Sequence, residues 1–173
     1  PKNHELDIKT IKTSDINSLE IETLLKEMKI EILLVYGGKI LKKNIIQTVS
    51  TIINCHYGFT PYYKGIASSI TALGDKDYRH MGATLHLIDE GIDSGAVLKY
   101  VQPDLTIKES IASILKKTMQ SGMEEQIKFA SELIKNKNMD SFIIPYPGKC
   151  YFSENSKLKE LNNRALLRLY SGE

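Results

Sequence analysis

The fold depends on one stretch of sequence, Asn54-Cys55-His56-Tyr57-Gly58-Phe59-Thr60-Pro61-Tyr62-Tyr63-Lys64-Gly65. The run before it, residues 49–53, is short, apolar and rich in β-branched side chains, which is typical of a buried strand in a parallel sheet. Asn54 and His56 are two positions apart, so both point to one face of an extended chain while Cys55 points to the other. A loop containing glycine and proline follows. Open α/β sheets bind their ligands at such strand ends.

Apolar runs on either side of this stretch indicate further strands and helices. Strands are predicted at residues 32–36, 84–88 and 97–101, and helices at residues 21–28, 66–73 and from residue 106 onward. This alternation predicts the α/β class, with a doubly wound, mainly parallel sheet. Such sheets carry about five or six strands, so this one is expected to be small or to lack its N-terminal half.

The organisation of the chain follows from the same patterns. We expect one α/β domain over residues 1–140 and a C-terminal extension over residues 141–173 that includes a charged helix near residues 156–170. A sheet without its first half would expose an edge, which predicts either a truncated chain or a homodimer in which a second copy covers that edge.

Composition narrows the class of protein. The chain has 173 residues and a formal net charge of +2, which gives no support for a nucleic-acid partner or a membrane surface. Cys55 and Cys150 are far apart and have no metal-ligand spacing, so no metal and a reduced, cytoplasmic setting are expected. No apolar run approaches the ~20 residues that a membrane helix needs.

Asn54, His56 and Asp93 are the candidate catalytic residues. Each lies at or just after the end of a predicted strand, and the carboxyl ends of neighbouring parallel strands would bring them into one cleft. Asn can donate to an oxyanion, His can exchange a proton near pH 7, and Asp can hold the His. Since no nucleophile accompanies them, direct transfer is favoured over a covalent intermediate.

Structural roles are the alternative for the same residues. Asn54 could cap a loop, His56 could be a hydrogen-bonded structural residue, and Asp93 could belong to an ordinary turn. His86 lies in the middle of a predicted strand, where packing is the favoured role, and His80 is expected at the surface. From spacing alone both interpretations stay open.

Together these motifs resemble the folate-dependent formyltransferase family. The resemblance rests on Asn54-Cys55-His56, on Pro61-Tyr62-Tyr63-Lys64-Gly65, on Asp89-Glu90-Gly91-Ile92-Asp93-Ser94-Gly95 and on Tyr36-Gly37-Gly38-Lys39-Ile40-Leu41, in the family's order and spacing. It covers residues 30–102 and implies a formyltransferase-like Rossmann variant. The loop character is most similar to that of amino-sugar formyltransferases.

The resemblance also implies roles. Asn54, His56 and Asp93 would form the catalytic triad, and the co-substrate would be 10-formyltetrahydrofolate. Its pterin would lie against the cofactor-binding residues Lys39, Ile40, Leu41, Ile88, Asp89, Gly91 and Ile92. The acceptor would be a small-molecule amine, with an amino sugar on a nucleotide favoured.

Two departures from the family pattern keep alternatives open. Gly58 stands in a loop where many members have Ser, and residues 1–28 lack the Gly-rich loop that helps to bind the acceptor's phosphate. The alternatives are a formyltetrahydrofolate hydrolase and a catalytically incomplete fragment of a methionyl-tRNA or other formyltransferase.

Overall fold

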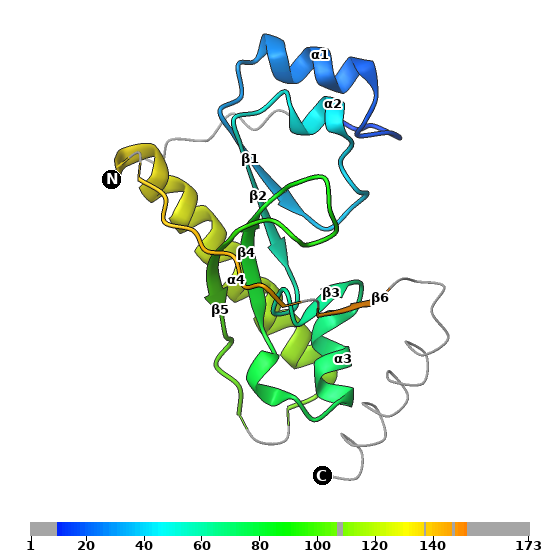
Figure 1. Cartoon of the computed structure of the whole chain (residues 1–173), viewed down its shortest axis with the longest axis vertical. Coiled ribbons are helices and arrows are strands. Elements are labelled where there is room, and N and C mark those ends of the chain that lie inside the picture. The colour runs from blue at the N-terminus through cyan, green and yellow to red at the C-terminus, as the bar shows by residue number, and fades with distance from the viewer. Residues whose placement is uncertain (1–9, 107–108, 137, 147, 152–173) are drawn as a thin grey trace.

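Four strands form the central sheet of this computed structural model, which describes residues 10–106, 109–136, 138–146 and 148–151. The strands are β1 (Ile32–Tyr36), β2 (Thr51–His56), β4 (Ala83–Leu87) and β5 (Val97–Val101), in the spatial order β1-β2-β4-β5. Figure 1 shows α1 (Leu19–Glu27) and α2 (Lys43–Ile46) above these strands, β3 (Tyr63–Gly65) and α3 (Ser68–Gly74) below them, and α4 (Ile111–Asn136) running alongside. The α/β class is therefore confirmed, with four strands in this sheet within the described residues.

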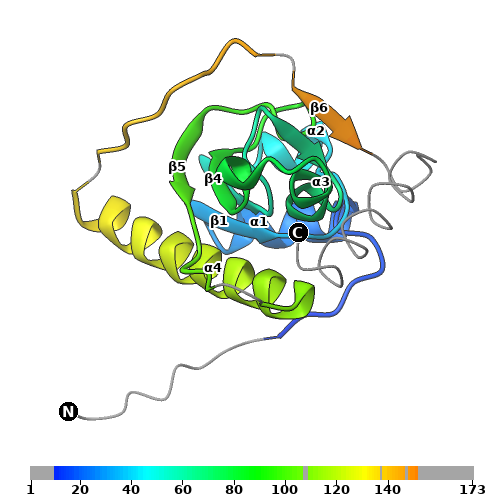
Figure 2. The same ribbon diagram turned by 90° about the horizontal axis from the view of Figure 1, so that it is seen from below.

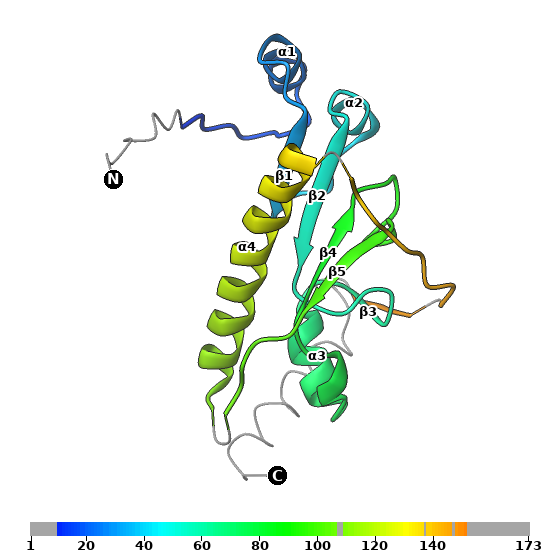
Figure 3. The same cartoon turned by 90° about the vertical axis from the view of Figure 1, so that its left-hand side faces the viewer.

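The strand directions correct the prediction of a mainly parallel sheet. β1 and β2 are parallel, but β4 runs antiparallel to both β2 and β5. The loop of residues 88–96 joins β4 to β5 without a helix, and a connection this short can only join antiparallel neighbours. Of the described helices, α4 (Ile111–Asn136) alone runs along a face of the sheet, so the doubly wound arrangement is not seen in this part of the chain (Figure 3).

Two short helices lie at one end of the sheet. Ser18 caps α1 (Leu19–Glu27) by accepting a hydrogen bond from the Ile21 N–H. α2 (Lys43–Ile46) follows β1. Both pack into a cluster with the start of β2, and together they support the loop between β1 and α2.

α4 packs on the sheet through every fourth residue. Ile114, Thr118, Gly122, Gln126 and Ala130 are buried along one row of the helix. Gln126 Nε2 lies 3.0 Å from Val35 O and 2.9 Å from Ile53 O, so one amide group ties α4 to both β1 and β2. On the outer face of α4, the apolar side chains of Met119, Met123 and Ile127 are exposed. At the edge of the sheet, β1 pairs with β2 alone among the described strands.

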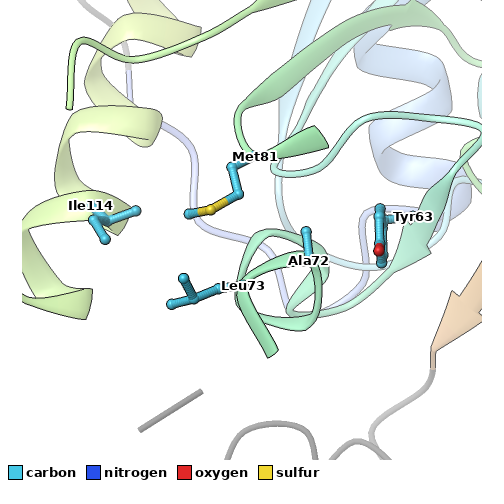
Figure 4. Packing of buried hydrophobic residues seen from close by; sticks show 5 residues of the cluster. All are labelled: Tyr63, Ala72, Leu73, Met81 and Ile114. Atoms are coloured by element: carbon cyan, nitrogen blue, oxygen red, sulfur yellow. The ribbon is translucent and has the colours of Figure 1, made fainter. Parts of the chain in front are cut away.

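A second core joins α4 to the region between β2 and β4. This region contains β3 (Tyr63–Gly65), α3 (Ser68–Gly74) and the short 3₁₀ helix η1 (Tyr78–His80). Figure 4 shows the cluster of Tyr63, Ala72, Leu73, Met81 and Ile114 that holds them together. β3 is thereby fixed next to the end of β2, which bears His56.

The chain after α4 returns across the molecule to reach β3. We call residues 138–146 and 148–151 the strap (Figure 2). Phe142 pairs with Val97 of β5, and β6 (Lys149–Tyr151) runs parallel to β3. The strap therefore contacts the elements before residue 140. The division at residue 140 stays a prediction, and the charged helix expected at residues 156–170 lies outside the described residues.

Candidate active site

His56 and Asp93 face each other at the carboxyl end of β2. The distance from His56 Nδ1 to Asp93 Oδ2 is 3.3 Å, and both side chains are largely buried. The other ring nitrogen, Nε2, donates to the Tyr63 carbonyl at 3.0 Å, and the Gly65 N–H donates to Asp93 Oδ2 at 2.8 Å. The backbone of β3 thus holds both side chains.

Asn54 and His86 form the second half of the cluster. They are opposite each other in the β2–β4 ladder, and Asn54 Nδ2 lies 3.0 Å from His86 Nε2. His86 Nδ1 donates to the Leu87 carbonyl at 2.8 Å, which leaves Nε2 as the acceptor of the Asn54 amide. Asp93 Oδ1 is 3.5 Å from Asn54 Nδ2 and 3.4 Å from His86 Nε2. The carboxylate of Asp93 therefore connects all three partners.

The three residues predicted to be catalytic are thus brought together, and His86 joins them. His86 was expected to have a packing role, because it lies within the predicted strand at residues 84–88. One signal was present: Thr84 and His86 alternate as polar residues within an otherwise apolar strand, so they share a face. Thr84 Oγ1 donates to the Gly58 carbonyl and accepts from the Thr60 N–H, which fixes the loop that follows His56.

Burial sets the electrostatics of the site. Burial lowers the pKa of His56 below its ordinary value and His86 adds to this, while the Asp93 charge and the Tyr63 carbonyl oppose it. Burial alone would raise the pKa of Asp93, but His86 and His56, which favour the charged carboxylate when they are protonated, and the Gly65 N–H outweigh it, and the pKa is lowered. The resting site therefore holds a neutral imidazole beside an ionised carboxylate.

A cavity of about 410 Å³ opens beside this cluster. Its lining includes the three candidate catalytic residues, His86, and the seven residues predicted to bind the co-substrate: Lys39, Ile40, Leu41, Ile88, Asp89, Gly91 and Ile92. Ile40 and Ile66 expose apolar surface there. The volume and the mixed lining suit an organic ligand that has a flat apolar part.

Side-chain hydrogen bonds hold both loops that border the cavity. Asn17 donates from Nδ2 to the Ile40 carbonyl and accepts from the Lys42 N–H, with N···O distances of 3.1 and 2.7 Å. Asp89 Oδ1 accepts from the Gly91 N–H and from the Ser94 hydroxyl. Asp89 therefore shapes the loop that carries Asp93, and Asn17 sets the path of residues 39–42.

Several other polar residues lie outside the cluster. His80 is half-buried rather than at the surface: its Nδ1 lies 2.8 Å from Asp77 and its ring stacks on Tyr62. Cys55 is a buried free thiol on the opposite face of β2, as expected, and burial raises its pKa to about 12.

Within the described residues no group of three or more His, Cys, Asp or Glu side chains could hold a metal ion. No helix in the same part of the chain has the length and apolar character needed to cross a membrane.

Sequence comparison links the chain to known formyltransferases. Residues 3–128 match the family model described as formyl transferase. The methionyl-tRNA formyltransferase of Kosmotoga olearia is 27% identical over 131 residues, which are 75% of this chain and 42% of that protein. That of Campylobacter lari is 34% identical over 97 residues, or 54% of this chain and 31% of its own. The chain thus spans less than half the length of these relatives.

Solved structures show the same fold. A likely sugar N-formyltransferase from Mycobacterium tuberculosis has a TM-score of 0.67 at 18% identity, covering 85% of this chain and 68% of its own. The formyltransferase PseJ from Anoxybacillus kamchatkensis, solved with a UDP-formamido sugar and tetrahydrofolate, has a TM-score of 0.60 at 21% identity, covering 75% of this chain and 67% of its own. Because the family model matches most of the chain, the protein belongs to the formyl transferase family.

Proposed function

We propose that this domain transfers a formyl group from 10-formyltetrahydrofolate to a primary amine. The observation that carries the proposal is the position of Asp93, which links His56, Asn54 and His86 at the wall of the 410 Å³ cavity. The donor would lie between residues 39–41 and 88–92, with its formyl group toward Asn54. Apolar surface from Ile40 and Ile66 would pack against its ring system.

The reaction needs one bond to form and one to break. The amine nitrogen attacks the formyl carbon, and the carbonyl oxygen becomes a tetrahedral oxyanion. Collapse of this intermediate breaks the bond to the folate nitrogen, which takes up a proton, and releases a formamide and tetrahydrofolate. The protein must therefore stabilise an oxyanion and carry one proton from the amine.

Asn54 and His56 are suited to these two tasks. The Asn54–Asp93 contact is weak at 3.5 Å, so the Asn54 amide can give it up to donate to an oxyanion. The Nε2–H of His56 is already donated to Tyr63, so Nδ1 is the nitrogen that can accept the amine's proton. Nδ1 lies beside Asp93, whose negative charge would stabilise the imidazolium that forms.

An amino sugar attached to a nucleotide is the proposed acceptor. Two solved neighbours support it, since PseJ was crystallised with a UDP-formamido sugar and WlaRD, a sugar 3N-formyltransferase, with dTDP and 5-N-formyltetrahydrofolate. Methionyl-tRNA is the second candidate acceptor, because the relatives with 27–34% sequence identity are named methionyl-tRNA formyltransferases.

The decisive experiment offers each acceptor to the purified chain together with 10-formyltetrahydrofolate. We expect tetrahydrofolate and a formamide to appear in equal amounts with a nucleotide-linked amino sugar. Transfer to methionyl-tRNA alone would replace the proposed acceptor. Formate release without an acceptor would indicate a hydrolase, and calorimetric folate binding without turnover would indicate an incomplete enzyme.

A matched pair of histidine variants tests the assigned mechanism. His56→Ala should lower kcat by roughly 10²-fold or more, because it removes the proton acceptor. His80→Gln removes a histidine that lies outside the cavity and stacks on Tyr62, so its kcat should fall far less than that of His56→Ala. Equal effects of the two substitutions would remove His56 from the mechanism.

A further inference from the structure

The strap ends on the strand that holds both His56 and Asp93. In the β3–β6 ladder, Tyr63 lies opposite Lys149 and Gly65 lies opposite Tyr151. The Tyr63 carbonyl accepts the His56 Nε2–H, and the Gly65 N–H donates to Asp93. Two residues of β3 therefore have the active site on one side and the strap on the other.

Close backbone contacts seat the strap on the start of β3. The Lys149 N–H donates to the Tyr62 carbonyl at 2.8 Å. Gly148 has a φ of +63°, and a Cβ at this position would lie 1.4 Å from the Pro61 carbonyl oxygen. The chain can approach Pro61 this closely only because residue 148 has no side chain.

Side chains add a second set of contacts at the same place. Lys149 Nζ forms an ion pair with Asp75, and Asp75 also accepts a hydrogen bond from the Tyr63 hydroxyl at 3.2 Å. The rings of Tyr62 and Tyr146 lie 5.1 Å apart between centroids. Since Tyr63 is 2% exposed and packs in the core cluster, its backbone position depends on these neighbours.

We infer that the strap is a positioning element of the active site, in which Gly148 and Lys149 set the backbone of β3 and thereby the orientation of His56 and Asp93. This inference rests on the proposed function for its catalytic consequence. A flanking segment would thus contribute to turnover without touching substrate. Misplacing a catalytic group by about 1 Å can cost 10²-fold in rate.

The variant Gly148→Ala tests the contact directly. Its methyl group cannot coexist with the Pro61 carbonyl, so residues 148–150 must move away from β3. We expect kcat to fall roughly tenfold or more, with the dissociation constant for folate nearly unchanged because the strap does not line the cavity. In nitrogen-15 NMR spectra, the His56 Nε2–H signal should exchange with solvent much faster than in the parent protein.

Two substitutions at Lys149 keep the test decisive if Gly148→Ala does not fold. Lys149→Met removes the ion pair with Asp75 and should reproduce part of the loss in kcat and in His56 N–H protection. Lys149→Arg keeps a cation there and should restore both. Lys99→Met removes a comparable ion pair, with Glu125, between β5 and α4 and should change neither quantity.

The outcomes separate this inference from the proposed function. Unchanged kcat and unchanged His56 N–H exchange in the folded strap variants would overturn the inference. Loss of His56 protection in a protein that shows no formyl transfer with any acceptor would leave the positioning role standing and contradict the proposed function.

Discussion

Asn54 and His86 lie opposite each other on antiparallel strands, and the Asn54 amide nitrogen is 3.0 Å from His86 Nε2. The pair orients the amide that is proposed to bind the oxyanion. His86 is itself held by the Leu87 carbonyl, and it lies 3.4 Å from Asp93. A residue next to the C-terminal end of β4 therefore completes a site that otherwise comes from the end of β2 and the loop after β4.

The substitution His86→Leu should lower kcat by roughly tenfold, because the Asn54 amide loses its nearest partner and can rotate away from the substrate. His86→Gln, which retains a hydrogen-bonding side chain, should lose less. Steady-state kinetics with a saturating acceptor would measure both variants. A Leu variant as active as the parent protein would show that His86 has only a packing role.

The buried imidazole of His56 should make stability depend on pH. An unfolded histidine has a pKa near 6.5, and burial lowers the folded pKa. Between these two values the unfolded chain binds the extra proton, so the free energy of unfolding should decrease as the pH falls, by at most about 1.4 kcal/mol per pH unit. Above pH ~7 this contribution disappears.

Urea unfolding of the parent protein and of His56→Asn between pH 5 and 8 would measure this effect. The variant should gain stability relative to the parent as the pH falls through 6.5, because it cannot take up the proton. A difference that stays constant over the whole range would contradict the assigned shift in the pKa of His56.

Gly58 should not tolerate a side chain. A Cβ there would lie 2.3 Å from Ser68 Cβ and 2.9 Å from His56 Nε2. Gly58→Ala should therefore lower both the melting temperature and kcat. Adding Ser68→Gly removes the first clash only, so the double variant should recover stability more than activity. Equal recovery of both would show that the contact with His56 does not matter.

Gln126→Leu should lower the free energy of unfolding by about 1–3 kcal/mol, because the Val35 and Ile53 carbonyls lose their amide donor. Gln120→Leu is the control on the same helix. Gln120 is exposed and bonds only Glu124 in the described interactions, so the change should stay within about 0.5 kcal/mol. Denaturant unfolding of both variants would test whether Gln126 joins α4 to the sheet.

β2 and β4 differ in how much of their structure can be predicted from the sequence. The run at residues 49–53 predicts a buried strand that leads into Asn54 and His56 on one face, and β2 (Thr51–His56) confirms it, because alternation in an extended chain is a local property. The strand predicted at residues 84–88 is confirmed as β4 (Ala83–Leu87). Its direction was predicted wrongly, since β4 runs antiparallel to its neighbours and not parallel to them. Strand direction depends on how the connecting segments pack, and residues 57–82 fold beneath the end of the sheet rather than across its face.

Local spacing along the chain is enough to predict the α/β class, the shared face of Asn54 and His56, and the acidic glycine loop that bears Asp93. Long-range packing sets two other features: β4 is antiparallel, which brings His86 opposite Asn54, and the strap reaches β3 behind the active site. Both features are contacts between segments far apart in the chain, and burial of shared surface, rather than local pattern, selects such pairings.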